Sequence, residues 1–426
     1  MVNPSPLDDS VNRVLDAAER AHAHGQAEEA ERLWSVARSL SPDHPFVSAA
    51  MGVRALRNGN AAEAREFLEK AVQARPLDPS LYLNLATALR ALGDSETELR
   101  TLDRALELDP FFFPLLLQKA SLLERTGKTK DAARMYGRAL ASHPPGDQIP
   151  AAWQPHIEYA QRMARADQEQ LESWLDSRMQ PVRQQHAQDS QERVDHCLQA
   201  ILGKRRIYVQ QPTHTHFPSL PAIEFYDRKD FPWVAQVEAA TEDMRAELLQ
   251  LLNEARGDFA PYLNHAPTDA LSQWKELNRS QRWSALFLHR YGERIEHNIA
   301  RCPRTVAALE GAPVVRITGR GPTSLFSLLE PKTRIPTHTG VTNTRLTVHI
   351  PLIVPPKCGF RVGSQTREWV PGTALIFDDT IEHEAWNDSD EPRVVLIFDI
   401  WNPFLTPAER DLMTAATAAI AEYYGD

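Results

Sequence analysis

Cysteine is scarce in this sequence of 426 residues, and its placement suggests no structural use. Only three cysteines are present, far apart from one another: Cys197, Cys302 and Cys358. So few and so widely spaced thiols indicate neither a disulfide framework nor a zinc site. We therefore expect a protein of the reducing cytoplasm.

Long hydrophobic runs are missing as well. No apolar stretch reaches the length of a membrane-spanning helix, and the first residues lack the basic and apolar segments of a signal peptide. Positive charge is in deficit, since 47 Lys and Arg stand against 57 Asp and Glu. Nucleic acids and anionic membranes both bind concentrated positive charge, so we expect neither as a partner.

A repeat of 34 residues dominates the first third of the chain. Glycine, proline and alanine each recur with this period: Gly25, Gly59, Gly93 and Gly127; Pro42, Pro76, Pro110 and Pro144; Ala37, Ala71, Ala105 and Ala139. Small residues let paired helices approach closely, the glycine turns the chain between them, and the proline ends the second helix. This is the tetratricopeptide pattern, in four copies over about residues 11–144. It predicts an all-α solenoid, whose concave side usually binds a peptide or protein.

The pattern changes twice after the repeats, which divides the chain into three regions. They are the solenoid at 1–145, connecting helices and a proline-rich linker at 146–221, and a second domain at 222–426. In the linker, His214 and His216 resemble a metal-binding pair, but we interpret them as a surface loop because no third ligand is near. The second domain begins with a helix expected over Trp233–Asn253. From Val314–Ile317 onward, short β runs alternate with turns, which predicts a jelly roll with flanking helices.

Two histidines and an arginine in the second domain point to chemistry. His338 lies beside a turn glycine, His383 follows 45 residues later, and Arg393 begins an apolar run. A redox-active iron needs at least two protein ligands and open positions, and neutral imidazoles suit it. A guanidinium in so apolar a strand needs a carboxylate partner, which a dicarboxylate such as 2-oxoglutarate would provide. The alternative is an ordinary ion pair with Asp399, Glu391 or another acid, and Arg393 taken alone would favour that alternative.

Three stretches together resemble the aspartyl/asparaginyl β-hydroxylase family. They are His338–Asn343, Ile376–Trp386, and Arg393 followed by Asp399–Pro403. The similarity begins near Ile223 and continues to the end, about half of the chain. Members of this family are Fe(II)- and 2-oxoglutarate-dependent oxygenases on a double-stranded β-helix, and the animal members also carry tetratricopeptide repeats before the catalytic domain.

The resemblance implies a role for six residues. His338 and His383 would bind the iron, Arg393 and Ser327 the distal carboxylate of 2-oxoglutarate, and His349 the carboxylate nearer the metal. Most related oxygenases have an acidic ligand two residues after the first histidine, where this chain has Gly340. The family is similar in lacking that acid, so water is expected in its place, with Asp379 as an acceptor behind the ligands.

The sequence also departs from the family at two positions near the expected site. Thr347 replaces an arginine of the animal members, and Asn402 replaces a histidine that often precedes the final proline. The membrane anchor and the paired cysteines of secretory-pathway members are missing too. Their extracellular substrates are therefore not transferred to this chain.

We expect an enzyme that uses Fe(II), 2-oxoglutarate and O2 to hydroxylate the β-carbon of Asp or Asn. The substrate would be a peptide or protein held partly in the tetratricopeptide groove. Three alternatives stay open: a lipid or small-molecule hydroxylase, a halogenase that uses the room at Gly340, and a tetratricopeptide scaffold without turnover. The sequence names neither the substrate nor the oligomeric state.

Overall fold

The computed structural model of the protein describes residues 6–142, 153–265, 273–317 and 319–424. The chain divides into two compact units, Met1–Gln191 and Glu192–Asp426, and each is described by itself. Within the described ranges, every helix is too short or too polar to span a membrane.

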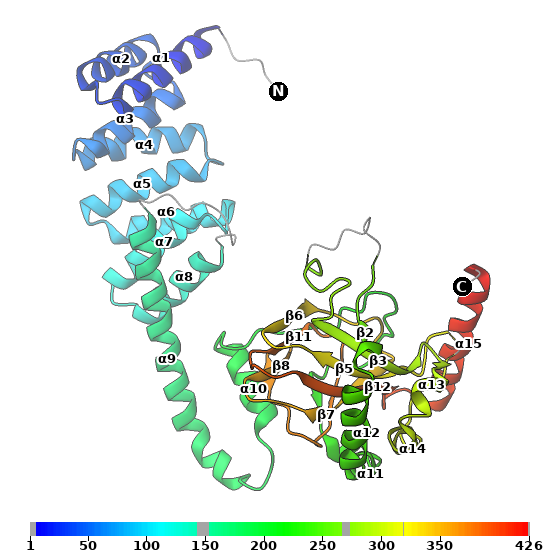
Figure 1. The fold of residues 1–426 in the computed structure, drawn as a ribbon. Helices are drawn as coiled ribbons and strands as arrows, with labels where there is room; N and C mark the ends of the chain where they lie inside the picture. The colour runs from blue at the N-terminus through cyan, green and yellow to red at the C-terminus, as the bar shows by residue number, and fades with distance from the viewer. Residues whose placement is uncertain (1–5, 143–152, 266–272, 318, 425–426) are drawn as a thin grey trace. The chain divides into compact units, whose positions relative to one another are not determined.

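Four antiparallel helix pairs stack in the N-terminal unit, as the 34-residue period predicts (Figure 1). The pairs are α1 (Pro6–Ala23) with α2 (Ala27–Leu40), α3 (Pro45–Arg57) with α4 (Ala61–Ala74), α5 (Pro79–Leu92) with α6 (Ser95–Leu108), and α7 (Phe113–Arg125) with α8 (Thr129–Ala141). Each pair packs on the next, so the predicted solenoid is confirmed.

The small residues that recur every 34 positions form the turns between paired helices and the close contacts between helices. The four glycines between paired helices have φ between 74° and 77°, a left-handed turn that favours glycine. The alanines of the second helices are fully buried, as at Ala71 and Ala105. At Gly52 the helices approach so closely that a Cβ would lie 2.4 Å from Cγ of Leu68. Pro144 lies outside the described residues.

The region expected to connect the two domains is divided between the units. The boundary predicted at residue 145 lies outside the described residues, and α9 (Gln154–Gln185) packs on α8. The C-terminal unit starts at Glu192 and so includes α10 (Glu192–Ile201) and the proline-rich segment, which lacks periodicity but is hydrogen-bonded to the β-domain.

Two antiparallel sheets form the C-terminal unit, as predicted for a jelly roll (Figure 1). The large sheet has the order β1-β10-β7-β12-β5-β3-β2, with β4 beside β3, and the small sheet has the order β6-β11-β8-β9. The strands are β1 (Phe225–Tyr226), β2 (Ala260–Pro261), β3 (Trp283–Arg290), β4 (Glu293–Arg294), β5 (Ser324–Leu329), β6 (Thr333–His338), β7 (Arg345–Ile353), β8 (Cys358–Val362), β9 (Gln365–Arg367), β10 (Leu375–Phe377), β11 (His383–Asn387) and β12 (Arg393–Trp401).

Two expected elements differ in the structure. The helix expected over Trp233–Asn253 is broken into α11 (Val234–Ala239) and α12 (Thr241–Glu254). The strand expected at Val314–Ile317 is wrong, because these residues form only isolated bridges, Val314 with Ile400 and Ile317 with Gly321. The remaining helices are α13 (Glu296–Ile299), α14 (Pro303–Leu309) and α15 (Pro407–Tyr424).

Alternation along the strands of the large sheet separates a core from a cavity. On β7, Leu346, Val348 and Ile350 pack in the core with Met244 and Leu248 of α12. The intervening side chains point to the other face, because successive residues of a strand face opposite ways. That other face, turned toward the small sheet, carries the candidate site.

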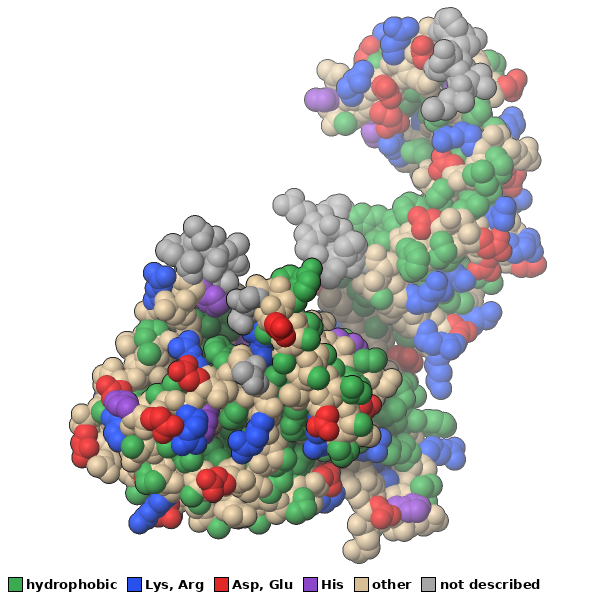
Figure 2. All heavy atoms as spheres, turned by 90° about the vertical axis from the view of Figure 1, so that its right-hand side faces the viewer, with side chains coloured by type: hydrophobic (Ala, Val, Ile, Leu, Met, Phe, Trp, Pro, Cys, Tyr) green, Lys and Arg blue, Asp and Glu red, His purple; other side chains and the backbone are tan. Residues whose placement is uncertain are grey.

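The surface carries charge of both signs. On the face drawn in Figure 2, acidic and basic side chains are interspersed over the described residues. Exposed ion pairs join side chains three or four residues apart on one helix, as Arg32 with Glu29 and Arg100 with Glu96. Such exposed pairs each contribute only about 0–1 kcal/mol to stability.

Candidate active site

All six side chains singled out from the sequence line one cavity of the C-terminal unit. The cavity has a volume of about 600 Å³ and is lined by strands of both sheets. The six are His338, His383, Asp379, Arg393, Ser327 and His349. The structure brings these residues together, while their roles stay predictions.

The two predicted iron ligands face each other across neighbouring strands. His338 ends β6, His383 begins β11, and the two are direct partners in the antiparallel pairing. Their ring centroids lie 4.0 Å apart. Because a metal lies about 2 Å from a ligating imidazole nitrogen, rings this close can share one ion.

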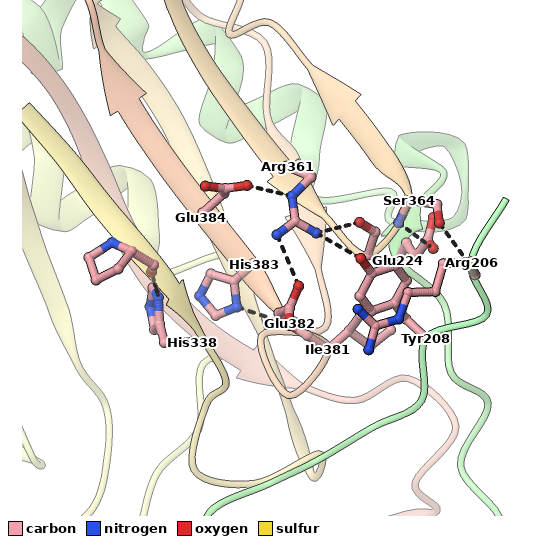
Figure 3. A network of polar contacts seen from close by, with 12 residues as sticks. Arg206, Tyr208, Glu224, His338, Arg361, Ser364, Ile381, Glu382, His383 and Glu384 are labelled. Carbon is pink, nitrogen blue, oxygen red and sulfur yellow. Dashed lines mark hydrogen bonds and ion pairs between the residues drawn. The ribbon is translucent and has the colours of Figure 1, made fainter. Parts of the chain in front are cut away.

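Hydrogen bonds fix which ring nitrogen of each histidine is free. Nδ1 of His338 lies 2.8 Å from the carbonyl oxygen of Pro336, and Nδ1 of His383 lies 3.0 Å from that of Ile381 (Figure 3). A carbonyl oxygen only accepts, so each Nδ1 carries the proton and each Nε2 keeps its lone pair. Burial lowers the pKa of His338, and burial together with the neighbouring His338 lowers the pKa of His383 well below its usual value. Both rings are therefore neutral and oriented to bind a metal through Nε2.

Arg393 is a buried cation at the start of β12. The residue is only 1% exposed, and its Nε has no hydrogen-bond partner. Its Nη1 donates only a long bond, 3.5 Å, to the carbonyl oxygen of Ser327, while Cζ lies 4.6 Å from the centroid of the Trp369 ring. Burial lowers the pKa of Arg393 to about 10, still high enough to keep it charged at neutral pH.

Among the residues that the structure describes, no acidic side chain pairs with Arg393, so an ordinary ion pair does not explain this cation. Asp399 pairs instead with Arg345, with 3.0 Å between Oδ2 and Nη1. Glu391 is bonded through its backbone. A charge buried without a partner is costly, and a carboxylate of a ligand bound at this end of the cavity would offset that cost.

Two neighbours complete the polar end of the cavity. Oγ of Ser327 accepts a hydrogen bond of 3.2 Å from Nε1 of Trp283, which leaves the hydroxyl proton free. Nδ1 of His349 is buried without a partner, and burial and the charge of Arg393 lower the pKa of its ring well below the usual value. A carboxylate would accept hydrogen bonds from Nε of Arg393 and from Nδ1 of a neutral His349 in the tautomer that carries its proton there. The residues present therefore fit 2-oxoglutarate.

Asp379 fills the space beside Gly340, where related oxygenases have their acidic ligand. A Cβ at Gly340 would lie 2.2 Å from Cγ of Asp379, and the Gly340 amide donates to the carbonyl oxygen of Asp379 at 2.6 Å. Oδ1 of Asp379 is buried without a partner, and burial raises the pKa of this carboxyl to about 7. Within the described ranges, no three His, Cys, Asp or Glu side chains are grouped to hold a metal. The predicted role of Asp379 behind the ligands stays a prediction.

Arg345 was missed by the sequence reasoning. Arg345 lines the cavity and pairs with Asp399, a residue of β12 that lies six positions after Arg393. The Nε of Arg345 is buried without a hydrogen-bond partner. The available signal was alternation on β7, which turns Arg345, Thr347 and His349 to the same face. A basic residue on the cavity-facing side of β7 would have indicated a charge inside the cavity, in the same way as Arg393 does on β12.

Aromatic rings form one wall of the cavity. Trp283 stacks on Tyr262 with 4.2 Å between centroids, and Trp274 lies edge-on to His338 at 5.1 Å. A second hollow of about 770 Å³ shares Arg290 and Tyr291 with the lining of the cavity.

The two departures from the family have different surroundings. Thr347 lines the cavity itself. Asn402 is fully buried outside it, where its Nδ2 donates to the carbonyl oxygen of Asn343 at 3.1 Å and its Oδ1 accepts from the amide of Phe404. Asn402 thus braces the turn after His338, whereas Thr347 leaves space where a larger side chain would reach the cavity.

Two antiparallel sheets around a cavity with two facing histidines agree with the double-stranded β-helix expected of this class of oxygenases. Residues 238–403 match the family described as Aspartyl/Asparaginyl beta-hydroxylase, and residues 79–112 match the tetratricopeptide repeat. The chain thus carries a C-terminal domain that belongs to the aspartyl/asparaginyl β-hydroxylase family, preceded by tetratricopeptide repeats.

Two relatives differ in what their names say they act on. An ornithine lipid ester-linked acyl 2-hydroxylase of Rhizobium tropici is 39% identical over 186 residues, which cover 43% of this chain and 62% of the relative. The human aspartyl/asparaginyl beta-hydroxylase is 33% identical over 183 residues, which cover 43% of this chain and 23% of that protein. The chain therefore spans less than two thirds of either relative.

The N-terminal unit is also similar to solved tetratricopeptide structures. A thermophilic repeat protein of Thermus thermophilus aligns with 24% identity and a TM-score of 0.29, over 31% of this chain and 74% of that one.

Proposed function

We propose that this protein is an Fe(II)- and 2-oxoglutarate-dependent hydroxylase. The observation that carries the proposal is the buried guanidinium of Arg393, without an acidic partner, in the same cavity as two facing histidines. When bound, iron and 2-oxoglutarate would supply oxidation by O2, so that 2-oxoglutarate, O2 and a C–H bond give succinate, CO2 and an alcohol.

The residues of the cavity would divide the work of binding. His338 and His383 would hold the metal through Nε2, each with its ring fixed by the carbonyl that Nδ1 contacts. Arg393 would bind the distal carboxylate of 2-oxoglutarate, and Ser327 would donate its free hydroxyl proton to it. Asp379 would accept a hydrogen bond from water beside the ligands through its unpartnered oxygen.

We propose a peptide or protein as the substrate, hydroxylated at the β-carbon of Asp or Asn. This carbon is a methylene bonded to a carbonyl carbon, and the unpartnered Nε of Arg345 offers a buried donor for the carbonyl oxygen. The tetratricopeptide repeats support a polypeptide substrate, because such solenoids usually bind peptides or proteins.

The Rhizobium tropici relative favours a second candidate, hydroxylation at position 2 of an acyl chain. That carbon is also a methylene next to a carbonyl, so the same contact with Arg345 would apply. The stacked rings of Tyr262, Trp283 and Trp274 offer an apolar wall for the chain. The shared chemistry is therefore a methylene beside a carbonyl group.

One experiment separates these functions. The full chain is incubated with Fe(II), 2-oxoglutarate and O2, with either a peptide digest or a lipid extract, and succinate and added oxygen are measured by mass spectrometry. We expect succinate coupled to oxygen on Asp or Asn, and none from His383→Ala. Oxygen on acyl chains alone would replace the peptide with the lipid candidate. Equal amounts of succinate from wild type and from His383→Ala would show that the protein does not turn over and would support the non-catalytic tetratricopeptide scaffold.

Asp379 argues against halogenation, the other enzymatic alternative. A glycine at position 340 would leave room for a halide, but the carboxyl group of Asp379 lies directly beside that glycine. Its unpartnered oxygen would accept a hydrogen bond from water and would not bind an anion. With chloride present, we expect hydroxylated product and no chlorinated product. A chlorinated product in place of the alcohol would reverse this assignment.

A further inference from the structure

The proline-rich segment that precedes β1 is bonded to both loops that carry the predicted metal ligands. We call its residues Arg205–Phe217 the strap. Its backbone amides donate to carbonyl oxygens beside both histidines: Gln211 to Thr380 at 2.7 Å, Thr213 to Gly340 at 2.9 Å, and His214 and Thr215 to Val341 at 3.1 Å. His214 and His216 are exposed, as expected for a surface loop. The strap thus continues the pairing where β6 has ended.

Asn343 anchors the strap to the turn after His338. Its side chain is fully buried, and its Oδ1 accepts from the amide of Phe217 at 2.7 Å. Its Nδ2 donates to the carbonyl oxygen of Phe217 at 2.9 Å and to Oε1 of Gln210 at 3.0 Å. All the bonding capacity of this amide nitrogen and one lone pair of its oxygen are therefore used on the strap.

Gln210 carries the connection on to the turn before His383. Its Nε2 donates to the carboxylate of Asp378 and, at 3.3 Å, to the carbonyl oxygen of Pro221. Asp378 in turn accepts from the amide and hydroxyl of Thr380 at 3.0 and 2.6 Å. One side chain of the strap therefore bridges Asn343 and Asp378, which stand on the two ligand-bearing loops.

A second set of contacts ties the start of the strap to the strand of His383 (Figure 3). Nε of Arg361 donates to Glu384 at 2.6 Å and Nη2 to Glu382 at 3.0 Å, so the cation joins the residues on either side of His383. Nη1 of the same arginine lies 3.4 Å from the hydroxyl of Tyr208. This clamp holds His383 from the outer face of the small sheet.

The histidines need this support because the sheet holds them weakly. β6 is the edge strand of the small sheet and pairs only with β11, and the pairing shifts register between His383 and Ala385. The ladder also ends at His338, the last residue of β6. A binding geometry has to be held within about 0.5 Å, which neighbouring hydrogen bonds usually ensure.

We propose that Gln210 and Asn343 are positioning residues for the metal centre, a role that rests on the proposed function. The hydrogen bonds from Asn343 to Gln210 and from Gln210 to Asp378 set the spacing of the two histidine-bearing loops, although neither bond involves an imidazole ring. Gln210 therefore controls metal affinity from outside the cavity. The strap belongs to the working site, although its sequence resembles a linker.

The test compares Gln210→Met with Gln211→Ala in the full chain. Gln210→Met keeps the size of the side chain but loses both bridges, whereas Gln211 is exposed and contributes its backbone amide to the strap. Mn(II) binding is titrated by calorimetry without cosubstrate, and the melting temperature of the metal-free protein is measured in parallel. We expect Gln210→Met to weaken Mn(II) binding by about 10-fold or more, the usual effect of removing such support. The melting temperature of the metal-free variant should also fall, because the buried Asp378 and Asn343 each lose one hydrogen-bond partner, so the titrations are made well below both melting temperatures. Gln211→Ala should bind like wild type.

Asn343→Asp provides a second variant, which keeps the acceptor for the Phe217 amide and removes the donor to Gln210. It should weaken Mn(II) binding in the same way, and it decides the question if Gln210→Met does not fold. Wild-type affinity in the folded variants would overturn the positioning role. Absence of Mn(II) binding in wild type would instead contradict the proposed function, so the two failures are distinct.

Discussion

Arg393 is the residue on which binding of 2-oxoglutarate depends. Its guanidinium is buried without an acid, so Arg393→Met should leave the metal-free protein at least as stable, because an unpaired charge no longer has to be desolvated. The measurement is thermal unfolding without ligands.

Arg345→Met is the matched control for that measurement. It removes the partner of the buried Asp399, which should lower the free energy of unfolding by about 3–5 kcal/mol. Equal destabilisation by both substitutions would contradict an acid-free environment for Arg393.

The close contact of Gly340 and Asp379 gives a second prediction at this scale. Gly340→Asp alone should weaken metal binding, because its Cβ would meet the carboxyl of Asp379 at 2.2 Å. Adding Asp379→Gly should relieve the clash and recover affinity. Metal titration of both single variants and the double variant should give a coupling energy of about 0.5–3 kcal/mol. Additive effects would show that the two side chains do not share one space.

Individual residues were predictable where their chemistry stands out in the chain. The pair His338 and His383 and the cation Arg393 stand in local contexts that resemble a known family, and all three line one cavity. Arg345 and Asn343 were missed, although alternation on β7 turns Arg345 to the cavity face and Asn343 ends one of the stretches that resemble the family. Their importance comes from partners far along the chain, Asp399 and Gln210, which periodicity does not reveal.

At the scale of elements, helix pairs of the solenoid touch through small residues. Gly52→Ala should lower the free energy of unfolding by about 1–3 kcal/mol, because its Cβ would lie 2.4 Å from Cγ of the buried Leu68. Gly137→Ala in α8 is the control. Apart from its chain neighbours and the backbone of its own helix, no heavy atom lies within 4 Å of the added Cβ, so Gly137→Ala should stabilise the protein by about 0.5–1 kcal/mol. Chemical denaturation of both variants checks the difference, and equal effects would contradict close packing at Gly52.

Elements with a strong period were predicted well, and irregular ones were not. The 34-residue repeat defines α1–α8, and the apolar runs define β5, β7 and β12. β6 escaped prediction because it contains Pro336 and alternates poorly, although it ends in a predicted ligand. The strap has no period either, since its order comes from backbone bonds to distant loops.

At the scale of the whole molecule, the two compact units should respond differently to ligands. The proposed site for Mn(II) and 2-oxoglutarate lies in the C-terminal unit. Calorimetric unfolding should therefore show two transitions, and the ligands should raise the temperature of only one of them. At 100 times the dissociation constant, the shift corresponds to about 2.7 kcal/mol. A single transition, or equal shifts of both, would mean that the units unfold together.

The most direct test of the proposed centre is a calorimetric titration of 2-oxoglutarate into the Mn(II)-loaded protein without oxygen. Wild type should bind one equivalent per chain. His383→Ala and Arg393→Met should each bind at least about 10-fold more weakly, since each loses one anchor of the cosubstrate. Wild-type affinity in either variant would contradict a shared site formed by the two histidines and Arg393.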